Sequence, residues 1–231
     1  MRVAIVENTR HTHHGQIGVA LSEAGHLWDV YRPYSGDGLP EASDYAALVV
    51  FGGEQAATDD AAYPYLPTLA SRMRAFGEAG RAVLGICLGA QLLARGYGAR
   101  NHLGTAPELG WCRLQSTKAG RSDPVMAAAP AEFPIFQWHS DTFDLPNGAV
   151  HLATGAGAAQ QAFRIGEKVY GTQFHFEANC AVVADWARLF PAQIEHMAPG
   201  WLDLHADHAA EHGAQADEAG LALARAWVAC I

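Results

Sequence analysis

Apolar and polar positions alternate in two different ways along the first hundred residues of the chain. Short apolar runs predict buried strands over residues 2–6, 26–31, 46–51 and 82–86. Between them, apolar positions recur at helical spacing and predict helices over residues 15–24, 64–78 and 88–96. Strands that alternate with helices form βαβ units, so this part of the chain predicts a parallel sheet covered by helices on both faces.

The pattern changes over residues 103–175, where short apolar runs follow one another with few helix signals. These runs predict strands over residues 110–114, 135–139, 150–153, 161–165 and 169–174, which we expect to be antiparallel additions to the sheet. Helical patterns return over residues 178–189 and 211–229. We therefore expect an α/β fold with an open, mostly parallel sheet, a main domain over residues 1–190, and a helical extension over residues 191–231 packed on the same domain.

The sequence Val-Leu-Gly-Ile-Cys-Leu-Gly-Ala-Gln at residues 83–91 carries the most informative motif. An apolar run ends in Gly85-x-Cys87-x-Gly89, and helix-forming residues follow directly, which is the pattern of a nucleophile elbow. A strained turn needs glycines on either side, and it puts the sulfur at a helix N-terminus, where the dipole favours negative charge. Cys87 is therefore a candidate nucleophile. The other interpretation is a buried cysteine in an ordinary βα turn.

A thiol nucleophile also needs a base and a group that orients the base. The segment Gly-Thr-Gln-Phe-His-Phe-Glu at residues 171–177 offers His175 and Glu177. They are two positions apart, so on one extended strand their side chains would point to the same face. A carboxylate beside an imidazole fixes its tautomer and stabilises its charged form.

Backbone donors for a developing oxyanion can also be found in the sequence. The elbow supplies the N–H of Leu88, the residue after the candidate nucleophile. A second donor is expected from the double glycine that follows the third predicted strand, with Gly53 as the candidate. A plain turn after a strand would explain the double glycine equally well.

Composition and charge narrow the class of protein. The chain is 50% apolar and 17% charged, which is ordinary for a globular protein. A formal charge of −9 repels phosphate backbones and anionic membranes, so we expect neither nucleic acid nor a membrane as partner. The four cysteines form no CxxC pair, and neither a P-loop nor a GxGxxG motif occurs, so no metal, nucleotide or other cofactor is expected. Without a signal peptide or an apolar span, a cytoplasmic location is the default.

Taken together, the two catalytic motifs resemble those of the class I glutamine amidotransferases. The chain is most similar to stand-alone members that are like the glutaminase domain of GMP synthase. Supporting stretches are Phe51-Gly-Gly, Tyr63-Pro-Tyr-Leu, Glu108-Leu-Gly-Trp111, Trp138-His-Ser-Asp-Thr-Phe143 and Gln161-Ala-Phe-Arg164. The resemblance covers roughly residues 2–190 and implies a flavodoxin-like fold.

The resemblance implies a role for each matching residue. Cys87 would attack the side-chain amide of glutamine, His175 would protonate the leaving ammonia, and Glu177 would orient His175. The N–H groups of Gly53 and Leu88 would hold the oxyanion. Substrate contacts would come from Gln91, which matches the position facing the α-amino-acid end, and from the segment Ser140, Asp141 and Thr142.

The sequence departs from the family pattern at two positions. Phe176 stands between the candidate histidine and glutamate, where the family usually has proline. Because the spacing is unchanged, we expect an intact triad on an altered loop. Glu54 follows the double glycine, again where proline is usual. It could change the loop on the glutamine side or the charge at the mouth of the pocket.

Three functions remain open at this point. The chain could release ammonia from glutamine for a separate synthetase subunit. It could instead cleave γ-glutamyl compounds as a γ-glutamyl peptidase, or act without hydrolysis as a redox-sensing or chaperone-like protein. The histidines of the His11–His14 loop follow the first strand, where α/β folds bind ligands, and could shape substrate selection, although a solvated loop also explains them. His205, His208 and His212 are expected on one exposed polar helix face.

Overall fold

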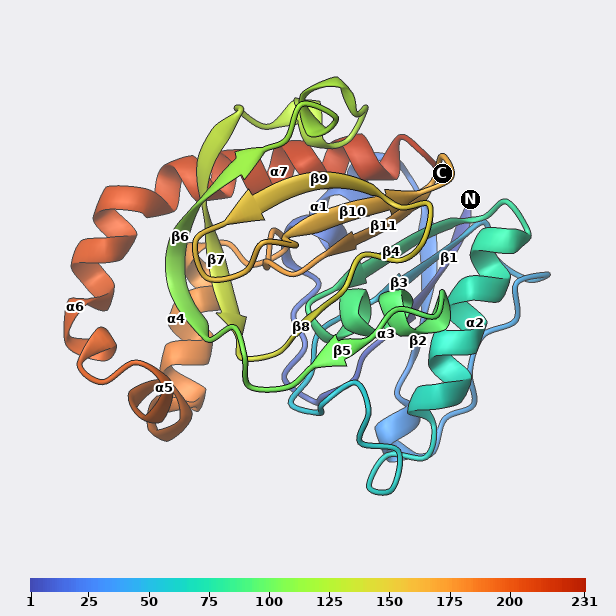
Figure 1. Cartoon of the computed structure of the whole chain (residues 1–231), viewed down its shortest axis with the longest axis horizontal. Coiled ribbons are helices and arrows are strands. Elements are labelled where there is room, and N and C mark those ends of the chain that lie inside the picture. Colours follow the sequence, from blue (N-terminus) through green and yellow to red (C-terminus); the bar gives the residue numbers. More distant parts are fainter.

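The computed structural model describes residues 1–231 and contains a nine-stranded sheet with helices on both faces (Figure 1). The strand order is β2-β1-β3-β4-β11-β10-β9-β6-β7. Its strands are β1 (Arg2–Val6), β2 (Leu27–Tyr31), β3 (Ala47–Val50), β4 (Ala82–Ile86), β6 (Glu108–Ser116), β7 (Glu132–His139), β9 (Val150–Gly155), β10 (Ala162–Ile165) and β11 (Val169–Thr172). Two short strands, β5 (Asn101–His102) and β8 (Thr142–Phe143), pair separately.

Seven α-helices surround the sheet. They are α1 (Gly15–Glu23), α2 (Leu66–Glu78), α3 (Leu88–Gly96), α4 (Cys180–Leu189), α5 (Pro191–Met197), α6 (Trp201–His208) and α7 (Ala214–Val228), with a π-helical turn over Ala209–Gly213. Helices α2 and α3 pack together with a core of 20 buried residues on one face. Helices α1 and α7 pack together on the other face, over a core of 38. The predicted α/β fold is confirmed.

The buried strands explain why helices pack on both faces of the sheet. In β1, Val3 and Ile5 belong to the core under α1 and α7, whereas Ala4 and Val6 belong to the core under α2 and α3. Alternate residues of a strand point to opposite faces, so a strand that is apolar throughout must be covered twice.

The expectation that all strands after residue 103 are antiparallel additions is wrong for one of them. Strand β11 pairs in parallel with β4, with Thr172 opposite Ile86. It lies inside the sheet and connects the parallel half to the antiparallel strands β10, β9, β6 and β7. The register brings the carboxyl ends of β4 and β11 side by side, and therefore brings their following loops together.

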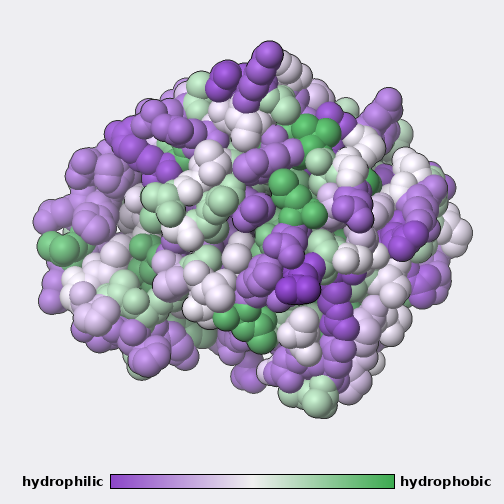
Figure 2. Space-filling view, viewed as in Figure 1, coloured by the Kyte–Doolittle hydropathy of each residue, from purple (hydrophilic) through white to green (hydrophobic).

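The end of the chain folds back over the sheet. Helix α7 packs against α1 and β7, and α5 and α6 extend the molecule on one side (Figure 1). The division at residue 190 stays a prediction. Figure 2 shows hydrophilic residues over much of one face, with small hydrophobic patches near its centre. No helix is both long and apolar enough to cross a membrane.

The predicted exposed histidine face near the end of the chain is wrong. His205, His208 and His212 are half-buried. The ring of His205 stacks on Trp111 at 5.9 Å and lies 5.1 Å from the ring of Trp201. These tryptophans come from β6 and from the start of α6, so the histidines extend an aromatic core that helical spacing alone does not predict.

Candidate active site

The predicted elbow forms between β4 and α3. Cys87 has φ 53° and ψ −110°, and it is the one residue other than glycine with a positive φ. A Cβ on Gly85 would lie 2.4 Å from the carbonyl oxygen of Gly89, and a Cβ on Gly89 would lie 2.0 Å from that of Val50. No side chain fits at either position, which explains both glycines. A strained residue of this kind is held by its surroundings and is typical of functional sites.

The structure brings His175 and Glu177 together, although not on an extended strand as predicted. Strand β11 ends at Thr172, and His175 makes an isolated antiparallel bridge to Phe136 of β7. The chain then turns at Phe176 and Glu177. This turn puts His175 Nδ1 2.7 Å from Glu177 Oε1, with both side chains buried.

Cys87 and His175 meet above Gly52. A Cβ on Gly52 would lie 3.2 Å from His175 Cε1 and 3.4 Å from Cys87 Cβ. A side chain at position 52 would therefore press between the sulfur and the imidazole. The three residues of the candidate triad come from two loops that follow neighbouring strands.

The electrostatic environment favours a charged imidazole at His175. Burial by itself lowers the pKa of the ring, but the interactions with Glu177 and with Cys87 outweigh it and raise this pKa well above its ordinary value. The carboxylate of Glu177 therefore fixes the orientation of the ring and also stabilises its protonated form.

Phe176, the first departure from the family pattern, is part of the support for this segment. Its side chain is buried. A Cβ on Gly220 of α7 would lie 2.5 Å from the Phe176 carbonyl oxygen, so the helix packs directly on the turn. Asp217 of α7 accepts a hydrogen bond from the backbone N–H of Cys180 at 3.0 Å. Helix α7 thus holds the turn that carries His175 and Glu177.

One cavity on the α3 side of Cys87 has polar walls. It measures about 360 Å³ and is lined by Gly53, Glu54, Gln55, Ala56, Cys87, Leu88, Gln91, Trp138, His139, Ser140, Asp141 and Met197. Gly53 and Leu88, the predicted oxyanion donors, therefore border the same space as the sulfur. The buried Gln91 amide donates to the backbone oxygen of Asp141 and to Gln173 Oε1, both at 3.3 Å.

Of the predicted substrate contacts, Gln91, Ser140 and Asp141 line this polar cavity, and Thr142 does not. Thr142 belongs to β8, which pairs with β5. His139, in the same motif, lies with its Nε2 3.2 Å from Glu108 Oε2. The buried His139 ring thus supports the cavity wall.

A second cavity opens on the other side of Cys87 and has aromatic walls. It measures about 310 Å³ and is lined by Thr9, His11, Thr12, His13, Phe51, Gly52, Gly53, Glu54, Cys87, Trp138, His175, Glu177, Trp186, Phe190 and Gln193. Trp138 is central, with its ring 5.7 Å from that of Trp186 and 5.6 Å from that of Phe190. His175 borders this cavity and not the polar one.

The His11–His14 loop forms one wall of this aromatic cavity and is partly exposed to solvent. His11 and His13 are half-buried and line the cavity. The Trp186 indole donates to the backbone oxygen of His11 at 3.3 Å, and the His11 ring meets the Phe190 ring edge-on at 4.9 Å. His13 Nε2 lies 2.8 Å from Asp185 Oδ2.

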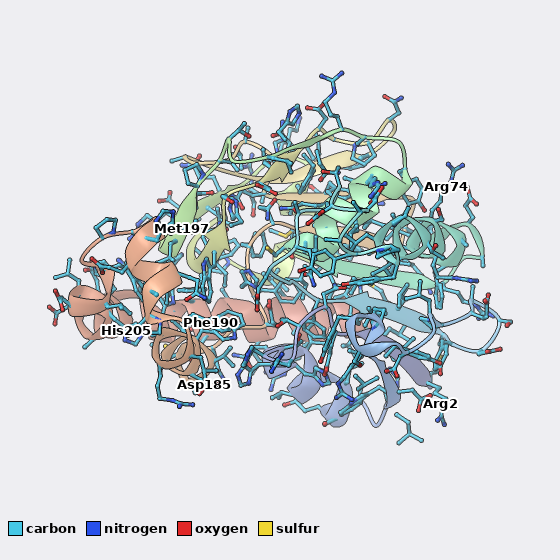
Figure 3. The ribbon with its side chains drawn as sticks, turned by 90° about the horizontal axis from the view of Figure 1, so that it is seen from below. Arg2, Arg74, Asp185, Phe190, Met197 and His205 are labelled. Atoms are coloured by element: carbon cyan, nitrogen blue, oxygen red, sulfur yellow. The ribbon has the colours of Figure 1, made fainter.

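The aromatic residues of α4 and its end were not predicted from the sequence. Trp186 and Phe190 are four positions apart, so they lie on one helical face, and that spacing could have indicated a shared wall. Phe190 and Met197, both labelled in Figure 3, come from the α4–α5 region and line the aromatic and the polar cavity respectively. No three histidine, cysteine, aspartate or glutamate side chains are grouped as ligands for a metal ion.

Comparisons with known proteins agree with this fold. A model of the family glutamine amidotransferase class-I matches residues 16–183. The glutamine amidotransferase-like protein YfeJ of Salmonella typhimurium is 34% identical over 66% of this chain and 65% of its own length. Gamma-glutamyl peptidase 4 of Arabidopsis thaliana is 27% identical, over 71% of this chain and 67% of its own.

Solved structures extend the similarity over nearly the whole chain. A glutamine amidotransferase from Methylobacillus flagellatus superposes with a TM-score of 0.86 at 26% identity, covering 100% of this chain and 95% of its own. One from Thermotoga maritima has a TM-score of 0.84 at 25% identity and 98% coverage of both chains. The chain belongs to the class I glutamine amidotransferase family, as the resemblance in its sequence indicated.

Proposed function

We propose that the chain hydrolyses the side-chain amide of glutamine through a γ-glutamyl thioester on Cys87. The observation that carries this proposal is the contact of a strained elbow cysteine with His175, which Glu177 holds at 2.7 Å. The sulfur, having given its proton to His175, attacks the γ-carbonyl carbon. His175 then donates a proton to the nitrogen, and ammonia leaves.

The second half of the reaction uses the same groups in reverse order. His175 takes a proton from water, the resulting hydroxide attacks the thioester, and glutamate is released. In both halves the negative charge on the carbonyl oxygen is stabilised by the N–H groups of Gly53 and Leu88. Gln91, Ser140 and Asp141 bind the α-amino-acid end in the polar cavity, whereas Thr142 lies outside it.

The relatives support glutamine as substrate and a separate acceptor for ammonia. GMP synthase of Thermomicrobium roseum is 30% identical over 71% of this chain but only 31% of its own length. The chain therefore spans about a third of that protein. A glutamine-hydrolysing GMP synthase subunit from Methanoregula boonei is 27% identical over 61% of this chain and 70% of its own. By analogy, ammonia would pass to a synthetase subunit encoded separately.

A glutaminase assay with an active-site label tests the proposal. We expect glutamate release from L-glutamine and covalent labelling of Cys87 by 6-diazo-5-oxo-L-norleucine, both abolished in Cys87→Ala. Labelling reports the nucleophile even if turnover waits for a partner. If Cys87 is neither labelled nor needed for glutamate release, but is readily oxidised by peroxide, the redox-sensing alternative is favoured instead.

A γ-glutamyl hydrolase that releases an amine larger than ammonia is the second candidate. Two observations favour it: the γ-glutamyl peptidase relative, and a cavity beside His175 that exceeds what ammonia needs.

A further inference from the structure

We infer that the aromatic cavity binds the amine half of the scissile amide and selects γ-glutamyl arylalkylamides, whose leaving amine carries an aromatic ring and no carboxylate. This inference rests on the proposed thioester chemistry and names its substrate class. The sulfur forms its bond to the γ-carbonyl carbon, the C–N bond breaks, and the amine leaves with a proton from His175. Water then splits the thioester to give glutamate.

The position of His175 assigns the amine to this cavity. A general acid must lie within hydrogen-bond reach of the nitrogen that it protonates. His175 borders the aromatic cavity and is absent from the walls of the polar one, whereas Cys87 borders both. With the glutamyl half bound beside Gln91, a substituent on the nitrogen can extend only to the His175 side.

The size of the cavity exceeds the need of ammonia. A molecule the size of water takes up roughly 30 Å³ of a liquid, and the cavity measures about 310 Å³. That volume lies at the lower end of the range for small-molecule sites, which are mostly lined by hydrophobic and aromatic side chains. An amine with one aromatic ring and a short linker matches this volume.

The rings that line the cavity match an aromatic guest. The Trp138 ring meets the rings of Trp186 and Phe190 at angles of 64° and 73°, with centroids 5.7 and 5.6 Å apart. Each also presents surface to the cavity. Such edge-to-face arrangements leave ring faces and edges available to a further aromatic ring.

The charges around the cavity exclude an amine that carries a carboxylate. No lysine or arginine lines it. Glu54, the second departure from the family pattern, lines both cavities, is exposed, and accepts a hydrogen bond from Thr9 at 3.2 Å. Two ion pairs involve wall residues, His13 with Asp185 and His175 with Glu177, so both imidazoles already have an anionic partner. A γ-glutamyl peptide, which leaves an amino acid, would place its carboxylate here without a strong cation.

A matched set of substrates tests this selection: γ-glutamyl-phenethylamide, γ-glutamyl-phenylalanine, γ-glutamyl-putrescine and L-glutamine. The first two differ only in the carboxylate. We expect kcat/KM for γ-glutamyl-phenethylamide to exceed those for the other three by at least about tenfold. Burial of an aromatic ring gives a factor of this size over glutamine and γ-glutamyl-putrescine, and a carboxylate bound without a partner gives a factor of this size against γ-glutamyl-phenylalanine. Glutamine or γ-glutamyl-phenylalanine as the best substrate would overturn the inference, and so would γ-glutamyl-putrescine.

Variants locate the effect in the cavity. Phe190→Ala should lower the ratio of kcat/KM for γ-glutamyl-phenethylamide to kcat/KM for glutamine by about tenfold. Gln193→Trp, which alters an exposed residue and narrows the cavity, should lower this ratio by a similar factor. The control Leu189→Ala removes a neighbouring, 36% exposed side chain outside the cavity and should leave the ratio unchanged. An unchanged ratio in folded Gln193→Trp would contradict the inference.

Failure of the thioester chemistry and failure of the cavity assignment give different results. If no amide is hydrolysed and 6-diazo-5-oxo-L-norleucine leaves Cys87 unlabelled, the thioester proposal is wrong and the inference falls with it. If glutamine is hydrolysed or Cys87 is labelled, but the arylalkylamide is not preferred, only the assignment of the aromatic cavity is wrong.

Discussion

The two cavities that meet at Cys87 are lined by residues from different parts of the chain. The polar cavity takes most of its walls from the elbow, from Gln91 on α3 and from the end of β7 with the residues that follow it, which belong to motifs visible in the sequence. The aromatic cavity takes its walls from the loop after β1 and from Trp186 and Phe190 around the end of α4. Under the proposed assignment, local sequence motifs supply the catalytic residues and the contacts to the glutamyl half, whereas binding of the leaving half depends on contacts between segments that are distant in the sequence.

The largest expected effect comes from Cys87, which lines both cavities. Cys87→Ala removes the nucleophile, and we expect kcat for every γ-glutamyl substrate to fall by about 10⁴-fold or more. Steady-state assays on glutamine and on γ-glutamyl-phenethylamide measure this. Retention of a tenth of the activity on either substrate would show that the two cavities do not depend on one nucleophile.

Glu177→Gln should have the next largest effect and should also not distinguish the cavities. Loss of the carboxylate that orients His175 is expected to lower kcat by about 10³- to 10⁴-fold. The pKa of His175 is raised in the folded state, so the charged ring stabilises the fold fully below the ordinary pKa of histidine, about 6.5, and this contribution is lost as pH rises through the raised pKa.

Removing the carboxylate lowers the pKa of His175, so in Glu177→Gln this loss of stability should begin at lower pH. Thermal unfolding across pH 5–10, compared between the variant and the wild-type protein, measures the shift. NMR titration of the His175 ring provides the direct check. An identical titration in both proteins would contradict the role given to the ion pair.

Gln91→Leu should weaken the polar cavity alone. The buried amide donates to Asp141 and Gln173, so its loss leaves two acceptors unpaired, and we expect kcat/KM to fall by about 10- to 100-fold. Because the glutamyl half is common to all substrates, the fall should be equal for glutamine and γ-glutamyl-phenethylamide. A fall confined to one substrate would mean that the two cavities are not separate subsites.

The smallest expected effect concerns the rim of the aromatic cavity. Asp185→Asn removes the partner of His13, a partly exposed pair worth at most about 1 kcal/mol. We expect kcat/KM for γ-glutamyl-phenethylamide to change by about two- to fivefold. We expect kcat/KM for γ-glutamyl-phenylalanine to rise, because His13 can then pair with the carboxylate of this substrate. Competition between the two substrates measures the ratio. A lower rate on γ-glutamyl-phenylalanine would reverse this expectation.

The sequence predicted the parallel half well because its signals are local. The alternation in β1 and the glycines around Cys87 each report a constraint that neighbouring residues impose. The meeting of His175 and Glu177 was predicted for the wrong reason, since it depends on a turn that α7 supports from forty residues away. Residues 191–231 were expected to be helical, but the separate helices α5 and α6 were not delimited because both are short. Pro191 and Gly200 indicate where helices begin, but they do not indicate how the segments around α5 and α6 pack against Trp111 or Trp138.

The contact of Gly220 and Asp217 with the segment around Phe176 and Cys180 sets an order of events during protein synthesis. The nucleophile leaves the ribosome more than a hundred residues before α7 does. Until α7 has emerged, the turn that carries the imidazole lacks its backing, so a half-made chain exposes the sulfur without an organised partner. On the proposed mechanism, a polypeptide that is still being synthesised is therefore inactive until α7 has docked.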